Sequence, residues 1–537
     1  MKLRIPDIPE AERTPLVVLL VDCIRQLEEE NALLKDEIAR LKGLKPRPEI
    51  KPSTLEASPP PPPGGDEGEG HKRPGSVKRA KTAHLSVHRV IPVLLPDPPE
   101  GAQKLKKVVE FVVQELICRV ENIRYERELW KTADGQVRLA PLPPEVLPGS
   151  HFGPQLQAYI LHQYHHQRVT QPLLLEQLRQ LGVDISAGQL NRILTEGKDI
   201  FHHEKEAILQ AGLETASYIQ VDDTGARHQG QNGYCTSISN ELFAYFESTD
   251  SKSRLNFLTI LGKPHSDYVL NEVARAYWER QGLASAVRER LRAGPEVFAN
   301  EGTWNERLAA CGVTTERQVR IATEGALLGS LTEHGVSPTL VVLSDGAPQF
   351  DILVHAACWV HAERPLHRLI PYNEQHRTAI ATIRQQIWEL YQELKAYQAQ
   401  PDPARTTELK TRLDALCAQR TGYPSIDQVL KDMAANQGDL LRVLERPEVP
   451  LHNNASESVI REYVTKRKIS GSTRSSAGRR CRDTFASLKK TCRALHVNFW
   501  EYLQDRLRGR GLMPRLPDLI RQRAKEWCPG KVQAAPA

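Results

Sequence analysis

Two short stretches of the sequence end an apolar run with aspartate. In "SYIQVDDTG" (217–225) strand-forming residues lead into Asp222 and Asp223, and in "TLVVLSDG" (339–346) a similar run leads into Asp345. A single aspartate at a strand end is usually a turn former that makes local hydrogen bonds. Two strands that each deliver a carboxylate at their exit, however, offer the oxygen ligands that Mg²⁺ prefers, in a place that substrate phosphates can reach. The pattern therefore predicts a divalent-cation site.

A third carboxylate is available in "HNNASESVIREYVTKRK", where Glu457 follows Asn454 by three residues. This spacing is also that of a capping box at a helix N-terminus, and Glu457 has Arg461 one turn later as an ion-pair partner. Considered alone, Glu457 is better explained as a capping residue. Its other interpretation, as a third metal ligand, depends on the composition of the segment after it.

A basic segment comes directly after Glu457. Between Arg461 and Arg482 there are eight Lys or Arg residues and one Glu, interleaved with Ser, Thr and Gly. This composition is typical of a surface that binds the phosphate backbone of DNA, largely without regard to sequence and with strong salt dependence. The predicted DNA-binding residues of this segment are Arg461, Lys466, Arg467, Lys468, Arg474, Arg479 and Arg480.

The order of these motifs resembles a known family. "VDDTG", then "LSDGAPQFD" with "ACWVHAERPL", then "NNASESVIREYVTKRKISGS" is similar to the DDE transposases of the insertion sequence 66 family, over roughly 150–265 and 335–505. The resemblance implies an α/β fold with a ribonuclease H-like catalytic core and helical insertions. It assigns Asp222, Asp345 and Glu457 as the catalytic residues and as the ligands of two Mg²⁺ ions, for which Mn²⁺ can substitute. Asp223 stands where the family commonly has Glu, and we interpret it as a neighbour that supports the ligands.

The implied activity is that of an Mg²⁺-dependent transposase. Such an enzyme cuts the ends of a mobile element and joins the resulting 3′-OH to target DNA by metal-assisted phosphoryl transfer. The partners are then double-stranded DNA, as element ends and as target, together with accessory transposition proteins. Two alternatives stay open at this point: a catalytically idle DNA-binding dimer, and a nuclease that cuts without joining.

Upstream of the first aspartate, residues 171–198 predict two short helices around a tight turn. Gly182 supplies the break, and Ser186 with Gln189 forms a capping box for the second helix. Helix-turn-helix spacing of this kind places the second helix in a major groove, with Gln189, Asn191 and Arg192 exposed to DNA. Many helical hairpins share the spacing without binding DNA.

The N-terminal 43 residues carry a heptad pattern. β-branched residues at one position, interrupted by a single Asn, alternate with Leu three residues later, which favours a parallel two-stranded coiled coil. The alternative is one amphipathic helix packed on its own core. The predicted dimerisation residues are Leu20, Ile24, Leu27, Asn31, Leu34, Ile38 and Leu41.

These elements give a domain layout for the 537 residues. We expect a coiled-coil helix (1–43), a Pro-rich and basic linker (44–100), a small β-containing module without zinc (101–150), the helix-turn-helix-like segment (151–212), the catalytic core (213–510) with helical insertions at about 266–335 and 365–450, and a C-terminal tail (511–537).

Cysteine usage and hydropathy indicate the cellular compartment in which the chain works. Nine cysteines are scattered without C-x-x-C pairs, which suggests free thiols in a reducing compartment. Cys358 and His361 have the spacing of half a zinc site, yet no second pair lies near them, so we expect no zinc. The longest apolar run, at 16–24, is about half of a membrane span. A cytoplasmic, nucleoid-associated protein without a membrane segment is the expectation.

Overall fold

The structure of the chain is a computed structural model that describes residues 149–526 without a gap, residues 109–143, and the shorter stretches 14, 17, 21, 85–94, 96, 101–103 and 146. The chain divides into two compact units, Met1–Arg119 and Val120–Ala537, and the sheet with its surrounding helices belongs to the second. The predicted dimerisation residues, from Leu20 to Leu41, lie outside the described residues, so the coiled coil stays a prediction. Within the described residues, no helix is both long enough and apolar enough to cross a membrane.

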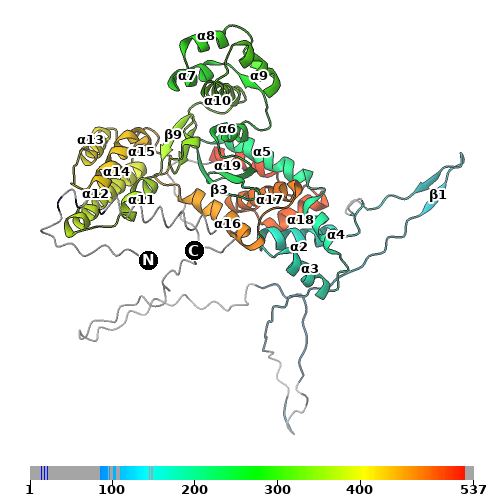
Figure 1. Cartoon of the computed structure of the whole chain (residues 1–537). Helices are drawn as coiled ribbons and strands as arrows, with labels where there is room; N and C mark the ends of the chain where they lie inside the picture. Colours follow the sequence, from blue (N-terminus) through cyan, green and yellow to red (C-terminus); the bar gives the residue numbers. More distant parts are fainter. Residues whose placement is uncertain are drawn as a thin grey trace, which may run out of the picture. The chain divides into compact units, whose positions relative to one another are not determined.

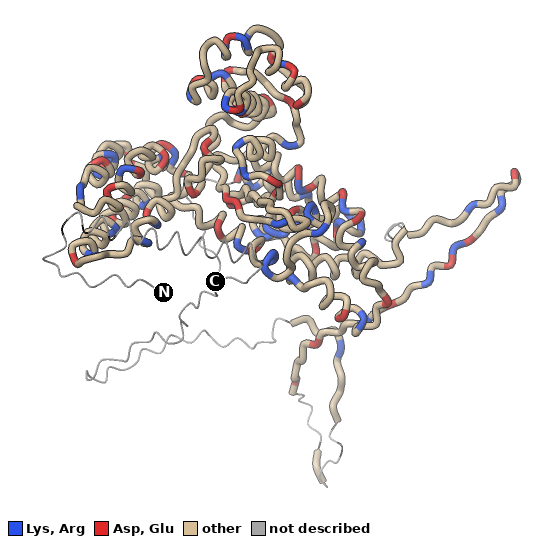
Figure 2. Tube along the Cα trace, viewed as in Figure 1, with Lys and Arg blue, Asp and Glu red and all other residues tan. Residues whose placement is uncertain are grey.

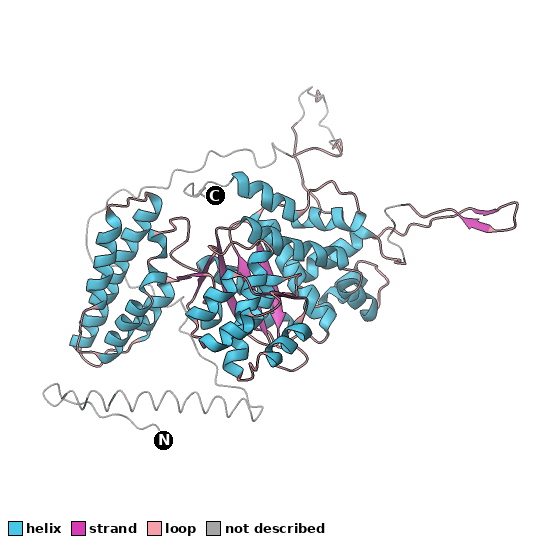
Figure 3. Cartoon of the chain, turned by 90° about the horizontal axis from the view of Figure 1, so that it is seen from above, coloured by secondary structure: helices cyan, strands magenta, loops and turns pink. Residues whose placement is uncertain are grey.

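The core is built around a five-stranded mixed sheet in the order β5-β4-β3-β8-β9 (Figures 1 and 3). The strands are β3 (Tyr218–Gly225), β4 (Tyr234–Ser239), β5 (Ala244–Thr249), β8 (Val341–Ser344) and β9 (Val354–Ala357). The first three form an antiparallel meander, and β8 and β9 continue the sheet parallel to β3. The chain turns between β4 and β5 at Asn240, whose side chain accepts the backbone N–H groups of Leu242 and Phe243. The α/β fold class is likewise confirmed.

Both strands that carry the sequence aspartates are buried until they reach them. The first four residues of β3 and all four of β8 are buried, because neighbouring strands and helices cover both faces of the sheet here. Burial ends at Asp222 in β3 and at Asp345 directly after β8. The strands therefore pass through the core and emerge at the acidic residues, as the sequence predicts.

The free edge of the sheet is closed by a helix. Three side chains of α17 (Ser476–Ala494) spaced by one turn, Asp483, Ser487 and Thr491, accept the alternate backbone N–H groups of β5 at 2.8, 2.9 and 3.1 Å. An edge strand left unpaired would offer these donors to another chain. Three more helices lie in this layer: α5 (Asp199–Thr215), α18 (Phe499–Arg508) and α19 (Leu516–Glu526). Helices α5 and α18 contact α17, and α19 contacts α5.

The segment before the sheet is helical. It consists of α2 (Pro154–Leu161), the short π-helix η2 (His162–His166), α3 (Gln171–Gln180) and α4 (Ala187–Thr195). The predicted pair of helices is present in α3 and α4, and the capping box of Ser186 and Gln189 is formed in both directions. Gly182 lies in the turn with φ of +88°, a conformation that favours glycine.

Two insertions interrupt the sheet order. The first lies between β5 and β8 and contains α6 (Arg254–Gly262), β6 (Tyr268–Val269), α7 (Glu272–Arg280), α8 (Ser285–Arg292), β7 (Val297–Phe298), α9 (Glu301–Ala310) and α10 (Glu316–Glu333). It is helical except for the two-residue ladder of β6 and β7. We call the part from Asp267 to His334 the first lobe.

The second insertion lies between β9 and α16 (Asn454–Ser470). Its elements are α11 (Trp359–Arg368), α12 (Glu374–Ala399), α13 (Arg405–Cys417), α14 (Pro424–Ala435), α15 (Gln437–Leu440) and the 3-10 turn η4 (Arg442–Leu444). It has an apolar core of its own that includes Trp359, Leu390 and Leu413. Both insertions begin at strand ends, so they lengthen the chain between the three acidic positions without breaking the sheet.

The region from 109 to 143 has little regular structure. It forms one hairpin, β1 (Leu129–Lys131) with β2 (Val137–Leu139), and residues 109–128 take no helix or strand. Its hydrophobic side chains, Phe111 and Trp130 among them, are exposed. The expected module at 101–150 is thus represented by a hairpin, and its role stays a prediction.

Candidate active site

The strand register places Asp222 and Asp345 at the same level of the sheet. Gln220 pairs with Leu343 across the parallel β3–β8 ladder, and each aspartate lies two residues further along the chain, Asp222 within β3 and Asp345 directly after β8. Since the carboxyl ends of parallel strands meet at one edge, the two carboxylates emerge side by side. The pairing that the sequence suggests only by analogy is therefore fixed by backbone hydrogen bonds.

A tight turn holds Asp345. Its Oδ1 accepts the backbone N–H of Ala347 at 3.0 Å, and the Oγ of Ser344 accepts that of Gly346, also at 3.0 Å. Gly346 has a φ of +95°, which a side chain would make costly. Ser344 is in turn bonded at 2.8 Å to the buried ring of His355. Asp345 is exposed but fixed, so it can act as a ligand without being reorganised.

Helix α16 brings Glu457 to the same edge. Buried Asn453, directly before the helix, donates from Nδ2 to the backbone oxygen of Val221 at 3.0 Å. Ser456 donates its backbone N–H to the Gln220 side chain at 3.3 Å. The first turn of α16 is thus bonded to β3 one to two residues before Asp222, and Glu457 is the next residue of that turn.

The capping prediction for Glu457 is wrong. The helix begins at Asn454 itself, the preceding Asn453 makes no side-chain cap, and the Asn453 side chain is used to bond β3. Glu457 instead accepts a hydrogen bond from Arg364 at 3.1 Å and lies 3.4 Å from His361, both on α11. Its expected partner Arg461 is not among these contacts. Glu457 is thus bonded to α11 and does not cap its own helix.

The pKa of Asp222 is shifted by its burial and by the charges of the neighbouring acids. Burial raises the pKa of Asp222 to about 7, and the negative charges of Asp345, Asp223 and Glu457 add to that rise against a backbone hydrogen bond that opposes it. Like charges that share a site disfavour ionisation, whereas a bound cation reverses this balance. A carboxylate in such surroundings is typical of a functional site rather than of a structural ion pair.

The carboxylate oxygens of Asp222, Asp345 and Glu457 do not all lie within 4.8 Å of one another. Among the described residues, the group whose ligand atoms all lie within 4.8 Å of one another is His265, Asp267 and His334, which shares no residue with the acidic edge. Arg364 bonds Glu457 to α11, and its guanidinium also donates to His361 at 2.7 Å. Burial lowers the pKa of His361, with the charge of Arg364 adding to that fall, so this ring is neutral.

Asp223 supports the site from the neighbouring position. Its carboxylate accepts a hydrogen bond from Gln349 at 2.7 Å, in the loop that follows Asp345. The next residue, Thr224, accepts one from Arg467 at 3.3 Å. Asp223 therefore connects the two aspartate-bearing segments, and its predicted support of metal ligands stays a prediction.

Arg254, at the start of α6, connects the site to the first lobe. Its guanidinium donates to the backbone oxygen of Pro348 at 2.5 Å and to the Tyr277 hydroxyl at 3.1 Å, and it lies 3.7 Å from buried Glu324. It thereby ties the loop after Asp345 to the first lobe. No local sequence signal marks it, because its hydrogen-bond partners are 23 and 94 residues away.

Lysines and arginines gather along α16 and α17 (Figure 2), but they fall into two groups. The exposed members of the predicted set are Arg192, Arg461, Lys468, Arg474 and Arg480. Arg467 and Arg479 are half-buried, and Arg479 pairs with Asp250 at 2.7 Å. Only the exposed group is placed as a DNA surface requires.

Lys466 must be removed from the predicted DNA-binding residues. It is 6% exposed, its Nζ donates to the backbone oxygen of Tyr164 at 2.6 Å, and it lies over the Tyr164 ring. Burial lowers its pKa to about 7, and the charges of Arg482 and Lys489 add to the fall. A helical periodicity that places Ile460, Tyr463 and Lys466 on one buried face could have revealed this.

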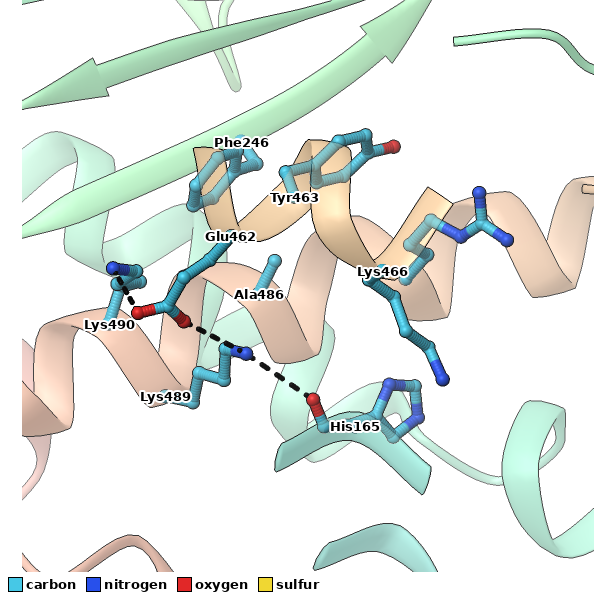
Figure 4. Close-up of a pocket in the computed structure, with 9 residues that line it drawn as sticks. His165, Phe246, Glu462, Tyr463, Lys466, Ala486, Lys489 and Lys490 are labelled. Carbon is cyan, nitrogen blue, oxygen red and sulfur yellow. Dashed lines mark hydrogen bonds and ion pairs between the residues drawn. The ribbon is translucent and has the colours of Figure 1, made fainter. Parts of the chain in front are cut away.

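Figure 4 shows a cavity that Lys466 lines together with two lysines of α17, Lys489 and Lys490. It has a volume of about 20 Å³, room for one water, and is lined by Lys466, Lys489, Glu462 and His165 among others. Burial alone would raise the pKa of Glu462, but its hydrogen bond to Lys490 and the charges of Lys489 and Lys490 lower it to about 2. This part of the basic segment therefore stabilises the packing of α16 on α17.

The prediction for α4, the second helix of the helix-turn-helix-like segment, also needs one correction. Asn191 and Arg192 are exposed as predicted, but Gln189 is half-buried and its Oε1 accepts the backbone N–H of Ser186 at 2.8 Å. Its side chain is committed to the cap. Cys358 is buried, and its sulfur accepts the backbone N–H of Asn453 at 3.3 Å.

Comparisons with known proteins indicate the family of the chain. The family model described as "Transposase IS66 family" matches residues 343–480, which include Asp345 and Glu457. A relative from Sinorhizobium fredii (strain NBRC 101917 / NGR234), described as "Uncharacterized protein y4jO", is 42% identical over 303 residues, covering 56% of this chain and 94% of that protein. No solved structure matches the chain.

Proposed function

We propose, from the premise that this chain belongs to the IS66 family of transposases, that it cuts the ends of a mobile element and joins them to target DNA by metal-assisted phosphoryl transfer. In this proposal Asp222, Asp345 and Glu457 are the catalytic residues. The observation that carries it is that one sheet edge receives a carboxylate from each of three segments far apart in sequence, β3, β8 and α16.

The sheet itself supports the proposal. A ribonuclease H-like core has an antiparallel meander of three strands followed by two strands parallel to the first, which is the order β5-β4-β3-β8-β9 found here. In such a core the acids of the first and fourth strands and of a later helix form the site. We therefore interpret residues 213–510 as this core, with its insertions placed after the third and the fifth strand.

The donor set fits Mg²⁺. Three carboxylates without a thiol or a neutral imidazole among them are the ligands of a hard cation. Bound at this edge, two Mg²⁺ ions, or Mn²⁺, would activate the attacking oxygen and stabilise the leaving oxygen of an in-line displacement. The chain's own residues position the reaction: the turn at Gly346 fixes Asp345, Asn453 fixes the start of α16, and Gln349 holds Asp223 beside the ligands.

Arg364 has a defined part in this account. In the structure it neutralises Glu457, which limits the repulsion among the acids. When Glu457 turns to a cation, the freed guanidinium lies beside the site and can receive a DNA phosphate, since Arg recognises phosphate through paired N–H groups. The exposed cations Arg461, Lys468 and Arg474 extend the same surface along the DNA backbone.

Cleavage and joining assays test the proposal. We expect wild-type protein with Mn²⁺ or Mg²⁺ to nick supercoiled plasmid DNA and to join a labelled oligonucleotide with a free 3′-OH to plasmid. Asp345→Asn and Glu457→Gln should lower both rates by about 10³-fold, because several kcal/mol of charge stabilisation are lost. Glu306→Gln, an exposed glutamate on α9, is the matched control and should keep full activity.

Each outcome separates the alternatives. If both carboxylate variants kept wild-type cleavage, the assignment of the catalytic residues would be wrong. Cleavage without joining would favour a nuclease, and tight DNA binding with neither activity would favour an idle DNA-binding dimer. A homodimer formed through residues 1–43 and a need for accessory proteins are further expectations of this proposal.

A further inference from the structure

A group of three metal-ligating side chains lies at the neck of the first lobe. His265 and Asp267 belong to the segment between α6 and β6, where the chain enters the lobe, and His334 is the residue that ends α10, where the chain leaves it. One ligand atom from each of the three lies within 4.8 Å of the others. The group shares no residue with the acidic edge, and the transposase chemistry proposed above makes no use of it.

Hydrogen bonds already arrange two of the three side chains. The Nε2 of His334 lies 3.0 Å from both carboxylate oxygens of Asp267, and the buried hydroxyl of Ser330, one turn earlier on α10, donates to Asp267 at 2.8 Å. Ligands of a tetrahedral zinc ion with bonds of about 2.0 Å lie about 3.3 Å apart, close to this separation. Metal-ligating carboxylates are commonly held by a second hydrogen bond of the kind that Ser330 makes.

The third side chain is close but not yet oriented. The His265 ring stacks on the His334 ring with centroids 3.5 Å apart and an angle of 4° between the planes. An ion lies in the plane of each imidazole that binds it, so the two rings must tilt apart to share one. His265 is exposed, so its side chain can turn at the surface.

The backbone around the group is rigid. Asn271, just beyond β6, donates to the backbone oxygen of Gly329 at 3.0 Å and to Thr332 at 3.1 Å. A Cβ at Gly329 would lie 2.0 Å from the backbone oxygen of Val269, so β6 and α10 approach each other as closely as glycine permits. The ligands therefore come from two segments that are already fixed side by side, which reduces the entropy that metal binding must overcome.

We propose that His265, Asp267 and His334 bind a divalent transition metal of the zinc type, with water in the fourth position. Two imidazoles and one carboxylate with an open position are a ligand set that suits zinc and does not suit Mg²⁺.

The position of the site indicates its purpose. Asp267 and His334 are 67 residues apart in sequence and enclose the whole lobe. A metal that joins them closes this loop in the folded state, as other cross-links do. We therefore expect the ion to lock the lobe onto α6, the helix whose Arg254 holds the loop after Asp345.

This site could not be found in the sequence. Its two histidines are 69 positions apart and have no C-x-x-C or H-x-x-H spacing, so the expectation of no zinc rests on the cysteines alone. Topology brings the ligands together, and no local pattern does.

Cobalt titration of the metal-stripped, tag-free full chain tests the proposal. Co²⁺ substitutes for zinc and absorbs strongly in the visible range when its site is tetrahedral. We expect wild type to give the intense visible spectrum of one tetrahedral Co²⁺, which Zn²⁺ removes, without the sulfur-to-metal band that a cysteine ligand would give. His265→Ala and His334→Ala should lose this signal, and Ser330→Ala should weaken binding about tenfold.

Matched variants control for other sites. His203→Ala, which removes an exposed histidine of α5, and Asp345→Asn, which removes a ligand of the acidic edge, should both leave the cobalt spectrum unchanged. Because His265 is exposed, its loss should not prevent folding, and the variant's circular dichroism checks this. An unchanged spectrum and affinity in His265→Ala, or a failure of wild type to bind Co²⁺, would overturn the proposal.

Discussion

Two carboxylates near the start of helix α16 have opposite surroundings. Asp222, against which the first turn of this helix packs, has other acids around it, and its pKa is raised to about 7. Glu462, five residues after Glu457 on the helix, has Lys489, Lys490 and Arg493 within 3.2 Å, and its pKa is lowered to about 2. Both groups are partly buried, so burial does not explain the contrast.

The difference separates a site from a structural cluster. Glu462 is neutralised by the chain itself and has nothing left to bind. The acidic edge is balanced in part by Arg364 and keeps an excess of negative charge, which a cation would relieve. Burial raises the pKa of both groups, so the neighbouring charges, acidic at Asp222 and basic at Glu462, account for the opposite directions of the two shifts.

The largest expected effect that tests the contrast between Asp222 and Glu462 is on the free energy of unfolding. Glu462→Gln should lower the free energy of unfolding by about 3 kcal/mol, because it leaves buried Lys489 and Lys490 without their counter-charge. Urea unfolding measures this change, and exposed Glu306→Gln should show none. Because the folded pKa is depressed, the contribution of Glu462 is present above its ordinary pKa of 4.5 and is lost as the pH falls toward 2. Equal stability of both variants would break the comparison.

A smaller effect concerns DNA binding by the two groups of cations. Replacing exposed Lys468, Arg474 and Arg480 by Ala should weaken DNA binding and reduce its salt slope by roughly 0.9 for each phosphate that is no longer neutralised. Lys466→Met should leave the slope unchanged, since this side chain faces Tyr164. Fluorescence anisotropy at several salt concentrations measures both. A reduced slope in Lys466→Met would place this lysine on the DNA after all.

Local patterns predict the positions of Asp222 and Asp345 correctly. An apolar run that stops at an acid specifies both a buried strand and its exit, and the capping box at Ser186 is equally local. The side-by-side register of β3 and β8 cannot be predicted in this way, because 122 residues separate the two aspartates. The resemblance to a family supplies that link, and the ladder Gln220–Leu343 gives its physical basis.

Charge patterns are the less reliable guide. The composition of the basic segment predicts one surface, yet α16 turns Lys466 inward with Ile460 and Tyr463, while Lys468 and Arg461 remain outside. The helical period carries this information and the count of charges does not. Likewise, the spacing of Asn454 and Glu457 matches a capping box, but Asn453 docks on β3 and shifts the helix start by one residue from the expected cap.

The most direct test of the central claim is a Mn²⁺ titration of the full chain, followed by the electron paramagnetic resonance signal of the free ion. The account predicts that wild type binds Mn²⁺ and that Asp345→Asn and Glu457→Gln each bind it at least about tenfold more weakly. Protons compete for Asp222 below its pKa of about 7, so wild-type affinity should fall about tenfold from pH 8 to pH 6. Equal Mn²⁺ affinity in wild type and both variants would contradict the account, because the three carboxylates would then not form one site.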